Sequence, residues 1–194
     1  MQIKWGEVLT GGRKKDMLKA KIADLGSYLP QRIVTSEEIA QKLGIPSGWI
    51  ERVTGVCERR YVTDETVAFM GAQAARQACT HAGIELSEID CIMGASATPQ
   101  QVVPCTATFF QRELGLEATN CPCFDVDATC LSFLFALHTA AHFVAGGAYR
   151  NILIVSSEIT TLTRNPEERE SAVLFGDAAA ASHFSARMPA TVSR

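Results

Sequence analysis

The sequence alternates short apolar runs with longer segments in which apolar residues recur every three or four positions. The short runs predict β-strands, and the periodic segments predict amphipathic helices. Strands are expected at 18–30, 56–62, 89–96, 121–126, 151–157 and 175–184. Helices are expected at 35–44, around Trp49, and at 64–83, 105–115 and 130–145. This alternation favours βαβ units, and therefore an α/β fold with a mostly parallel sheet.

Two helices carry clear boundary signals. Thr35 and Glu38 match a capping box at the start of the first helix, which Gly44 ends. Apolar residues line one face of the helix at 64–83, and Gly83 terminates it. Both segments are therefore predicted as complete, well-capped helices.

The composition is that of an ordinary globular protein. Of the 194 residues, 47% are hydrophobic and 20% are charged, and the formal net charge is −3. This charge provides no large cationic surface, so neither a nucleic-acid partner nor a membrane partner is expected. No uninterrupted apolar run reaches the ~18 residues of a membrane span. Because the N-terminus also lacks the apolar segment of a signal peptide, a cytoplasmic location is expected.

Composition also suggests three parts. Residues 1–16 are polar and rich in Gly and Lys, and are expected to form a flexible N-terminal extension. Residues 17–186 contain all the predicted elements and are expected to form one domain. Residues 187–194 are expected to form a short tail.

The cysteines are odd in number and lie mostly in apolar segments, which favours reduced, packed thiols over a disulfide framework. They are Cys57, Cys79, Cys91, Cys105, Cys121, Cys123 and Cys130. Cys130 differs from the other six because it opens a predicted helix, where free backbone N–H groups favour an anion and hence a nucleophilic thiolate. The alternative interpretation is a packed core cysteine. Asp125 and Asp127 would oppose the anion if they lay close, but their strand is expected to point them elsewhere.

Other chemistries find less support. His138 and His142 have i, i+4 spacing, but Cys130 would lie roughly 12 Å from His138 along a helix, so no metal site is expected. The glycine-containing segments match neither a P-loop nor a dinucleotide-binding fingerprint, and "FGDAAAA" predicts a closely packed strand. A thiol hydrolase or redox protein ranks last, because Cys121-Pro-Cys123 is not a CxxC motif.

Five segments, in this order, resemble motifs of β-ketoacyl-acyl-carrier-protein synthase III, in the thiolase-like superfamily: "GSYLP", "WIERVTGVCERR", "VDATCLSFLFAL", "ILIVSSE" and "NPEERESAVLFGDAAAA". The resemblance runs from about residue 17 to about residue 184. It implies the N-terminal half of a thiolase-like fold, with a mixed, mostly parallel sheet and helices on both faces. It also implies that Cys130 is the nucleophile, which takes an acyl group from coenzyme A at the foot of a narrow tunnel.

Two further residues carry over by position. Trp49 matches the tryptophan that stacks on the adenine of coenzyme A, and Arg169 matches an arginine that flanks the same nucleotide. Taken alone, they would be interpreted as a helix-end hydrophobe and a solvated charge. The family's "RTG" is "VTG" here, with Val53 in place of the arginine and Arg52 one position earlier. This departure implies weaker coenzyme A binding or an acyl-carrier donor.

The family consists of two duplicated halves, and its catalytic histidine and asparagine belong to the second half, which this sequence is expected to lack. The resemblance implies an acyltransferase half-enzyme of fatty-acid or polyketide synthesis. Cys130 would accept an acyl group for decarboxylative condensation with malonyl-acyl-carrier protein, an activity expected to be incomplete without the second half. The alternative is a non-catalytic partner, or a truncated fragment, that pairs with a separate C-terminal half.

The implied partners are acyl-coenzyme A, acyl-carrier protein, and either a second copy of the chain or a C-terminal half. No cofactor is expected, because the coenzyme A thioester is a substrate. Leu174, Phe175 and the segment 98–104 are candidate walls of the acyl pocket.

Overall fold

The computed structural model describes residues 20–186, which form two sheets, six α-helices and three short 3-10 turns. The strands are β1 (Lys21–Tyr28), β2 (Arg32–Thr35), β3 (Glu58–Tyr61), β4 (Cys91–Gly94), β5 (Cys123–Asp125), β6 (Asn151–Glu158) and β7 (Ala178–Ser185). The α-helices are α2 (Ser36–Leu43), α3 (Trp49–Thr54), α4 (Val67–Ala82), α5 (Thr106–Leu114), α6 (Ser132–Ala145) and α7 (Arg169–Ala172). Short 3-10 turns are η1 (Leu86–Glu88), η2 (Thr129–Leu131) and η3 (Thr160–Leu162).

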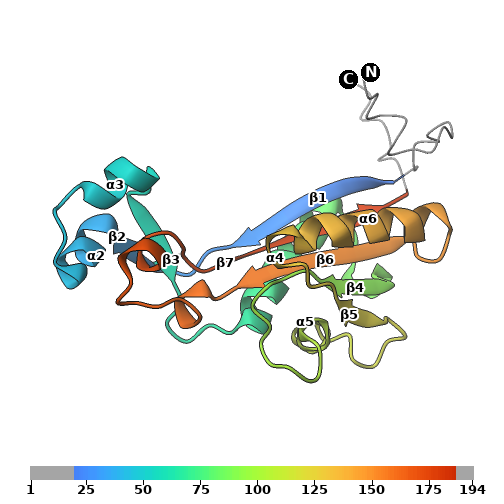
Figure 1. Cartoon of the computed structure of the whole chain (residues 1–194). Coiled ribbons are helices and arrows are strands. Elements are labelled where there is room, and N and C mark those ends of the chain that lie inside the picture. The colour runs from blue at the N-terminus through green and yellow to red at the C-terminus, as the bar shows by residue number, and fades with distance from the viewer. Residues whose placement is uncertain (1–19, 187–194) are drawn as a thin grey trace, which may run out of the picture.

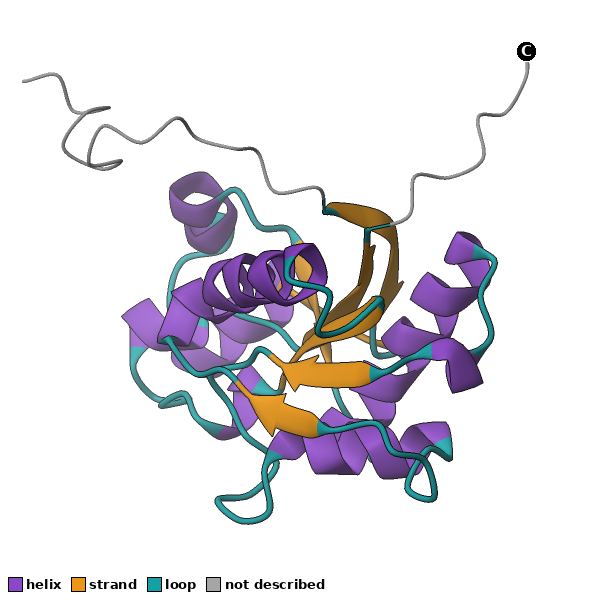
Figure 2. Ribbon diagram, turned by 90° about the vertical axis from the view of Figure 1, so that its right-hand side faces the viewer, coloured by secondary structure: helices purple, strands orange, loops and turns teal. Residues whose placement is uncertain are grey.

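The larger sheet has the strand order β1-β7-β6-β4-β5. β4 pairs in parallel with both β5 and β6, whereas β7 runs antiparallel to both β6 and β1. Four strands therefore point the same way and one is reversed, which confirms the predicted mixed, mostly parallel sheet. Figure 2 shows helices on both sides of this sheet, as expected.

β6 explains why both faces need helices. Its residues Ile152 to Val155 are all fully buried, as is typical of a central strand in a covered sheet. Because side chains alternate along a strand, Leu153 and Val155 pack into the core formed with α4 and α5, while Ile152 and Ile154 pack against α6. The sheet is thus the middle layer of three (Figure 1).

α4 lies unusually close to β1 and β7, because small residues face one another there. A side chain on Gly26 of β1 would place its Cβ 2.1 Å from the Ala74 carbonyl oxygen and 2.5 Å from the Ala78 nitrogen. On β7, Ala179 and Ala181 are buried in the same core. The close packing predicted from the alanine run is therefore present, with α4 as the neighbour.

A second, smaller unit consists of the antiparallel pair β2–β3 with α2, α3 and α7, and we call it the small unit. It has its own core, formed by Val34, Ile39, Ala40, Ile50, Tyr61 and Val173. Buried Asp177, just before β7, ties this unit to the larger sheet: its carboxylate accepts hydrogen bonds from Val62 N (2.9 Å) and Thr161 N (3.0 Å). In Figure 1 the small unit lies at one end of the molecule.

Three sequence expectations need correction here. The strand expected at 18–30 ends at Tyr28, and a separate strand, β2, follows it. The capping box at Thr35 is half formed: Thr35 accepts from Glu38 N (3.1 Å), but the Glu38 carboxylate pairs with Lys42 (2.7 Å). No helix or strand was expected between the strands at 151–157 and 175–184, but η3 and α7 lie there.

The predicted extension at 1–16 and the tail at 187–194 lie outside the described residues. Within residues 20–186, no helix is both long enough and apolar enough to cross a membrane.

Replacing Gly26 with Ala should destabilise the fold by about 3 kcal/mol, because the added methyl group would overlap the backbone of α4. Gly44→Ala is the matched control: Gly44 has φ 63° and open space around its Cβ position, so only the left-handed backbone cost of about 1 kcal/mol is expected. Urea unfolding measures both changes. Equal losses for the two variants would contradict the close approach of β1 to α4.

Candidate active site

Cys130 lies at the edge of the sheet where the parallel strands end. β4, β5 and β6 point the same way, so the segments that follow Gly94, Asp125 and Glu158 meet at one edge. Ligand sites in sheets of this kind form at the carboxyl ends of the strands. Cys130 is in the segment that follows β5, within η2 and directly before α6.

The backbone of this segment adopts an uncommon conformation. Thr129, which precedes Cys130, has φ +53°, a left-handed value that is costly for a β-branched residue. Asp127 Oδ1 accepts from Thr129 N (3.0 Å). Ser132 Oγ accepts from Ala128 N (2.9 Å) and donates to Thr129 O (2.7 Å). Two side chains therefore hold the turn that carries Cys130.

The helix expected at 130–145 begins two residues later, at Ser132, because the turn at Thr129 delays the α-helical conformation. The Cys130 side chain is exposed in the described part of the chain, whereas the sequence resemblance placed it at a buried helix start and at the foot of a tunnel. The position before the amino end of α6 agrees with the expectation.

The two acids before Cys130 behave differently. Asp125 points away from it, because its carboxylate accepts from Thr106 N (2.6 Å) and Ala107 N (2.8 Å) at the start of α5. Gly94 leaves room for this carboxylate, since a Cβ there would lie 2.3 Å from Asp125 Oδ1. Asp127 instead stays in the turn with Thr129. The hydrogen bonds of Asp125 agree with the expectation that it points elsewhere, whereas Asp127 lies outside β5 and bonds the residue before Cys130.

All seven cysteines are free thiols, and three of them, Cys79, Cys91 and Cys121, are buried. Burial raises the pKa of Cys79 and Cys121 to about 11 and that of Cys91 to about 12. Burial also raises the pKa of Cys123. Cys57 is exposed, but its thiol donates to Glu51 (3.3 Å), which raises its pKa. Cys57 and Cys130 are the two exposed thiols.

The structure brings Trp49 and Arg169 together, although they are far apart in the sequence. Trp49 begins α3, Arg169 begins α7, and the Arg169 guanidinium lies over the Trp49 ring at 4.5 Å from its centroid. Arg169 Nη2 also pairs with Glu170 Oε1 at 2.9 Å. A planar group between them would need about 3.5 Å on each side, so Arg169 must move aside for a ring to stack on Trp49.

Two further exposed residues of α3, Arg52 and Val53, lie close to Trp49 in the sequence. Val53, one helical turn after Trp49, has 52% of its surface exposed. Arg52 is exposed as well and points in a different direction from Val53, as expected. Because it is three residues after Trp49, it lies on the same side of α3 as Trp49. The pair therefore offers a flat surface with one guanidinium, which is itself partly neutralised by Glu170.

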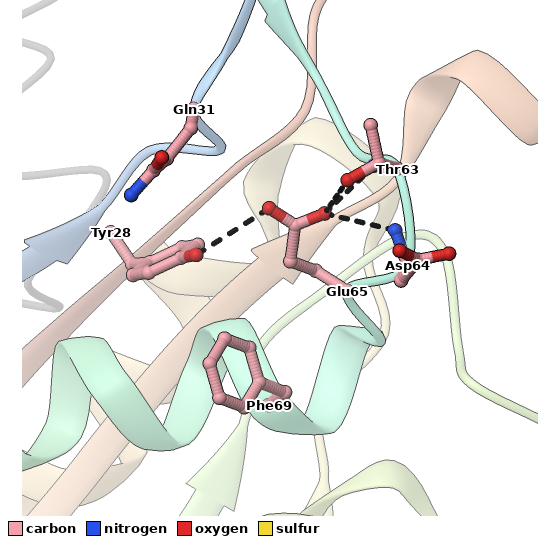
Figure 3. Close-up of a pocket in the computed structure, with 6 residues that line it drawn as sticks. All are labelled: Tyr28, Gln31, Thr63, Asp64, Glu65 and Phe69. Carbon is pink, nitrogen blue, oxygen red and sulfur yellow. Dashed lines mark hydrogen bonds between the residues drawn. The ribbon is translucent and has the colours of Figure 1, made fainter.

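Two hollows are lined by other residues. The first has a volume of about 430 Å³ and is lined by Tyr28, Gln31, Thr63, Asp64, Glu65 and Phe69 (Figure 3). Of its two acids, Asp64 and Glu65, the carboxylate of Glu65 already accepts hydrogen bonds from Thr63 N (2.7 Å) and Asp64 N (3.2 Å), and backbone hydrogen bonds lower the pKa of Glu65. Of its residues only Tyr28 lies in one of the quoted motifs, "GSYLP", and none was predicted as a site residue.

The second hollow, of about 240 Å³, includes Thr98, Pro99 and Gln100, which belong to the predicted acyl-wall segment 98–104. Leu174 and Phe175, the other candidate wall residues, are exposed and do not line it. Cys130, Trp49 and Arg169 line neither hollow. The site residues predicted from the sequence thus fall into two groups: the Cys130 thiol and the stacked Trp49–Arg169 pair.

The histidines add no metal centre within residues 20–186, where no group of three or more potential ligands lies together. His138 and His142 are neighbours on α6, with ring centroids 4.7 Å apart, and both are exposed. His183 is buried on β7, where its Nε2 lies 3.1 Å from Asn151 Oδ1.

The sequence is similar to those of known β-ketoacyl-[acyl-carrier-protein] synthases III. The sequence profile of 3-oxoacyl-[acyl-carrier-protein (ACP)] synthase III matches residues 124–192, which include Cys130, α6 and Arg169. β-Ketoacyl-[acyl-carrier-protein] synthase III of Rhodopirellula baltica is 40% identical over 162 residues, which cover 83% of this chain and 46% of that protein. The Neisseria meningitidis enzyme of the same name is 39% identical, over 88% of this chain and 53% of its own length.

Solved structures agree. 3-Oxoacyl-[acyl-carrier-protein] synthase III from Aquifex aeolicus superposes with a TM-score of 0.81 at 32% identity, over 88% of this chain and 55% of its own. The priming β-ketosynthase of the R1128 polyketide pathway gives 0.82 at 34% identity, over 90% and 52%. The chain spans about half the length of the curated relatives it matches. In sequence and in fold, it therefore matches about half of a β-ketoacyl-[acyl-carrier-protein] synthase III, the half that its motifs identified as N-terminal.

Proposed function

We propose that Cys130 accepts an acyl group from a thioester, as the first step of a decarboxylative condensation with malonyl-acyl-carrier protein. The observation that carries this proposal is the exposed thiol on a strained turn, at the carboxyl ends of three parallel strands and before the amino end of α6. The relatives are synthases of fatty-acid or polyketide synthesis, which supports the same class of reaction.

In the proposed reaction, the Cys130 thiolate attacks the carbonyl carbon of the acyl thioester, and the donor thiolate leaves. The free N–H groups of the first turn of α6 favour negative charge at this end of the helix. The carbanion formed when a malonyl thioester loses carbon dioxide then attacks the acyl-cysteine, which yields a 3-oxoacyl product and the free thiol. The second step needs donors for the developing oxyanion, and we assign these to a second half of the fold.

The nucleotide end of an acyl-coenzyme A donor is assigned to Trp49 and Arg169. An indole face and a guanidinium suit a flat, electron-rich ring. Val53 and the Arg169–Glu170 ion pair reduce the positive charge available for phosphates, which keeps an acyl-carrier-protein donor as the alternative. No cofactor takes part in this proposal, since coenzyme A enters and leaves as part of a substrate.

A second candidate function is that of a partner chain that pairs with a C-terminal half or with a second copy of itself. The observation that favours it is the outer face of α6 and its preceding turn, where Leu131, Leu134 and Phe135 are each about half exposed. Their i, i+3, i+4 spacing puts them on one face. An apolar face of this kind is typical of a surface that another protein covers.

Iodoacetamide should alkylate Cys130 at least about 10-fold faster at pH 8 than Cys79, Cys91 and Cys121, because the buried thiols hold little thiolate. Peptide mass spectrometry of a time course measures the seven rates. Cys130→Ser should remove the fastest reaction and leave the other rates unchanged. Equal labelling of all seven thiols would refute the assignment.

Incubation with a short acyl-coenzyme A should add one acyl mass to the chain, on the peptide that contains Cys130, because a thioester exchange transfers only the acyl group. Intact-mass and peptide measurements detect it. Cys57→Ser is the matched control, since it removes the other exposed thiol and should leave acylation unchanged. Acylation that persists in Cys130→Ser would disprove the proposed nucleophile.

The double substitution Leu134→Glu and Phe135→Glu should abolish association with itself or with a separately expressed C-terminal half of a homologous synthase, because it puts two charges on the apolar face of α6. Leu162→Glu, at a residue that is 79% exposed on η3, is the control and should associate like the parent. Light scattering after size exclusion measures the mass. If the parent chain stays monomeric both by itself and when mixed with the C-terminal half, the partner function is contradicted.

A further inference from the structure

We propose that Arg164 and Arg59 are positioning residues, which hold α7 so that Arg169 lies on the ring of Trp49. This inference rests on the proposed function only for its consequence, the choice of acyl donor. The positioning itself rests on contacts within the small unit. Neither arginine was identified by the sequence motifs as a site residue.

The two arginines bind the end of the segment that carries Arg169. Arg59 Nη2 donates to the Val173 carbonyl oxygen (2.8 Å), and Arg164 Nη1 donates to the carbonyl oxygen of Ala172. Ala172 is the last residue of α7 and Val173 follows it. Both guanidinium groups therefore satisfy carbonyl oxygens at the carboxyl end of the helix, where a positive charge is favourable.

α7 needs such support because it has only four residues. Helices of this length do not form on their own in water, and no side chain caps the amino end of α7. Val173 anchors the segment further by packing in the same core as Ile50 of α3. The position of Arg169 relative to Trp49 is thus fixed by what holds the end of α7.

The arrangement connects α7 to the rest of the small unit. Arg59, on β3, also donates through Nη1 to Ser36 Oγ at 2.9 Å, at the start of α2. The Arg164 guanidinium lies 4.7 Å from the centroid of the Tyr61 ring, also on β3. β3 therefore contributes to both contacts with the end of α7: it carries Arg59, and its Tyr61 ring packs against Arg164.

The charges of these two arginines have no acidic partner among the described residues. Arg59 is 6% exposed, and the Nε atoms of both side chains are buried without a hydrogen-bond partner in this part of the chain. Burial, and to a smaller extent the nearby charge of Arg164, lower the pKa of Arg59. A buried cation without an acidic partner is costly, and for Arg59 the bonds that offset this cost are those to the Val173 carbonyl oxygen and to Ser36 Oγ. Arg164 is half-buried, and its guanidinium bonds the Ala172 carbonyl oxygen.

The consequence concerns donors that carry a nucleotide. If α7 loses its support, Arg169 is no longer held next to Trp49. A nucleotide-bearing thioester, for which Arg169 has to move aside only far enough to admit a ring, then loses its flanking guanidinium. A thioester that lacks the nucleotide makes no use of this pair. The reaction at Cys130 itself is also unaffected, because η2 and α6 are held by Asp127 and Ser132.

The first measurement is independent of acyl transfer. In a Trp5→Phe background, which leaves Trp49 as the single tryptophan, Arg164→Met should raise the acrylamide quenching constant of Trp49 fluorescence about 2-fold, as Arg169→Ala should. Arg112→Met is the matched control, because Arg112 also lies over an aromatic ring, that of Phe109 at 5.2 Å, but on α5. Unchanged quenching in Arg164→Met would overturn the proposal.

The second measurement compares two acyl donors for Cys130. With Arg164→Met, the KM for acyl-coenzyme A should rise about 5-fold, while the rate with the N-acetylcysteamine thioester and the rate of iodoacetamide alkylation stay unchanged. An equal loss with both donors would show a merely structural role and would overturn the positioning assignment. If the parent chain accepts no acyl group from either donor, the proposed function fails, and the quenching result alone decides whether Arg164 positions Arg169.

Discussion

The place of Cys130 depends on a backbone conformation that is unfavourable by itself. A left-handed threonine costs on the order of 1–2 kcal/mol. Thr129 adopts that conformation because Asp127 accepts from its N–H group and Ser132 donates to its C=O group. Each of these hydrogen bonds contributes about 1 kcal/mol, which is enough to offset the strain. The thiol is thereby presented beyond the end of β5 and ahead of α6.

Cys130 and the Trp49–Arg169 pair are held by different parts of the molecule. The thiol is held by the larger sheet, whose core strand β6 is buried on both faces. The Trp49–Arg169 pair is held by the small unit, whose core contains few side chains. Cys130 therefore belongs to the part of the molecule with the larger core. The Trp49–Arg169 pair, which would contact a nucleotide, belongs to the small unit with the smaller core.

The sequence predicted most of the elements, because their signals are local. Gly83 ends α4, and Thr66 begins it by accepting from Phe69 N at 3.0 Å. The start of α6 was wrong by two residues, since the turn at Thr129 depends on side-chain hydrogen bonds that apolar periodicity does not report. β2 was missed because it has four residues and follows β1 closely. Trp49 and Arg169 came from motifs, but their contact depends on α7, whose four residues give no periodic signal.

The pairing of β1 with β7 joins the first and last strands of the larger sheet, with Lys21 opposite Ser185. During synthesis on a ribosome, β1 emerges long before the strand that completes its hydrogen bonds. At the usual rates of translation, the remaining ~150 residues take on the order of 10 s. Throughout that interval the backbone of β1 is an unpaired strand edge, which can pair with another chain and aggregate. α4 follows β1 within a few seconds and packs on Gly26, so it is the element that can cover β1 until β7 is made.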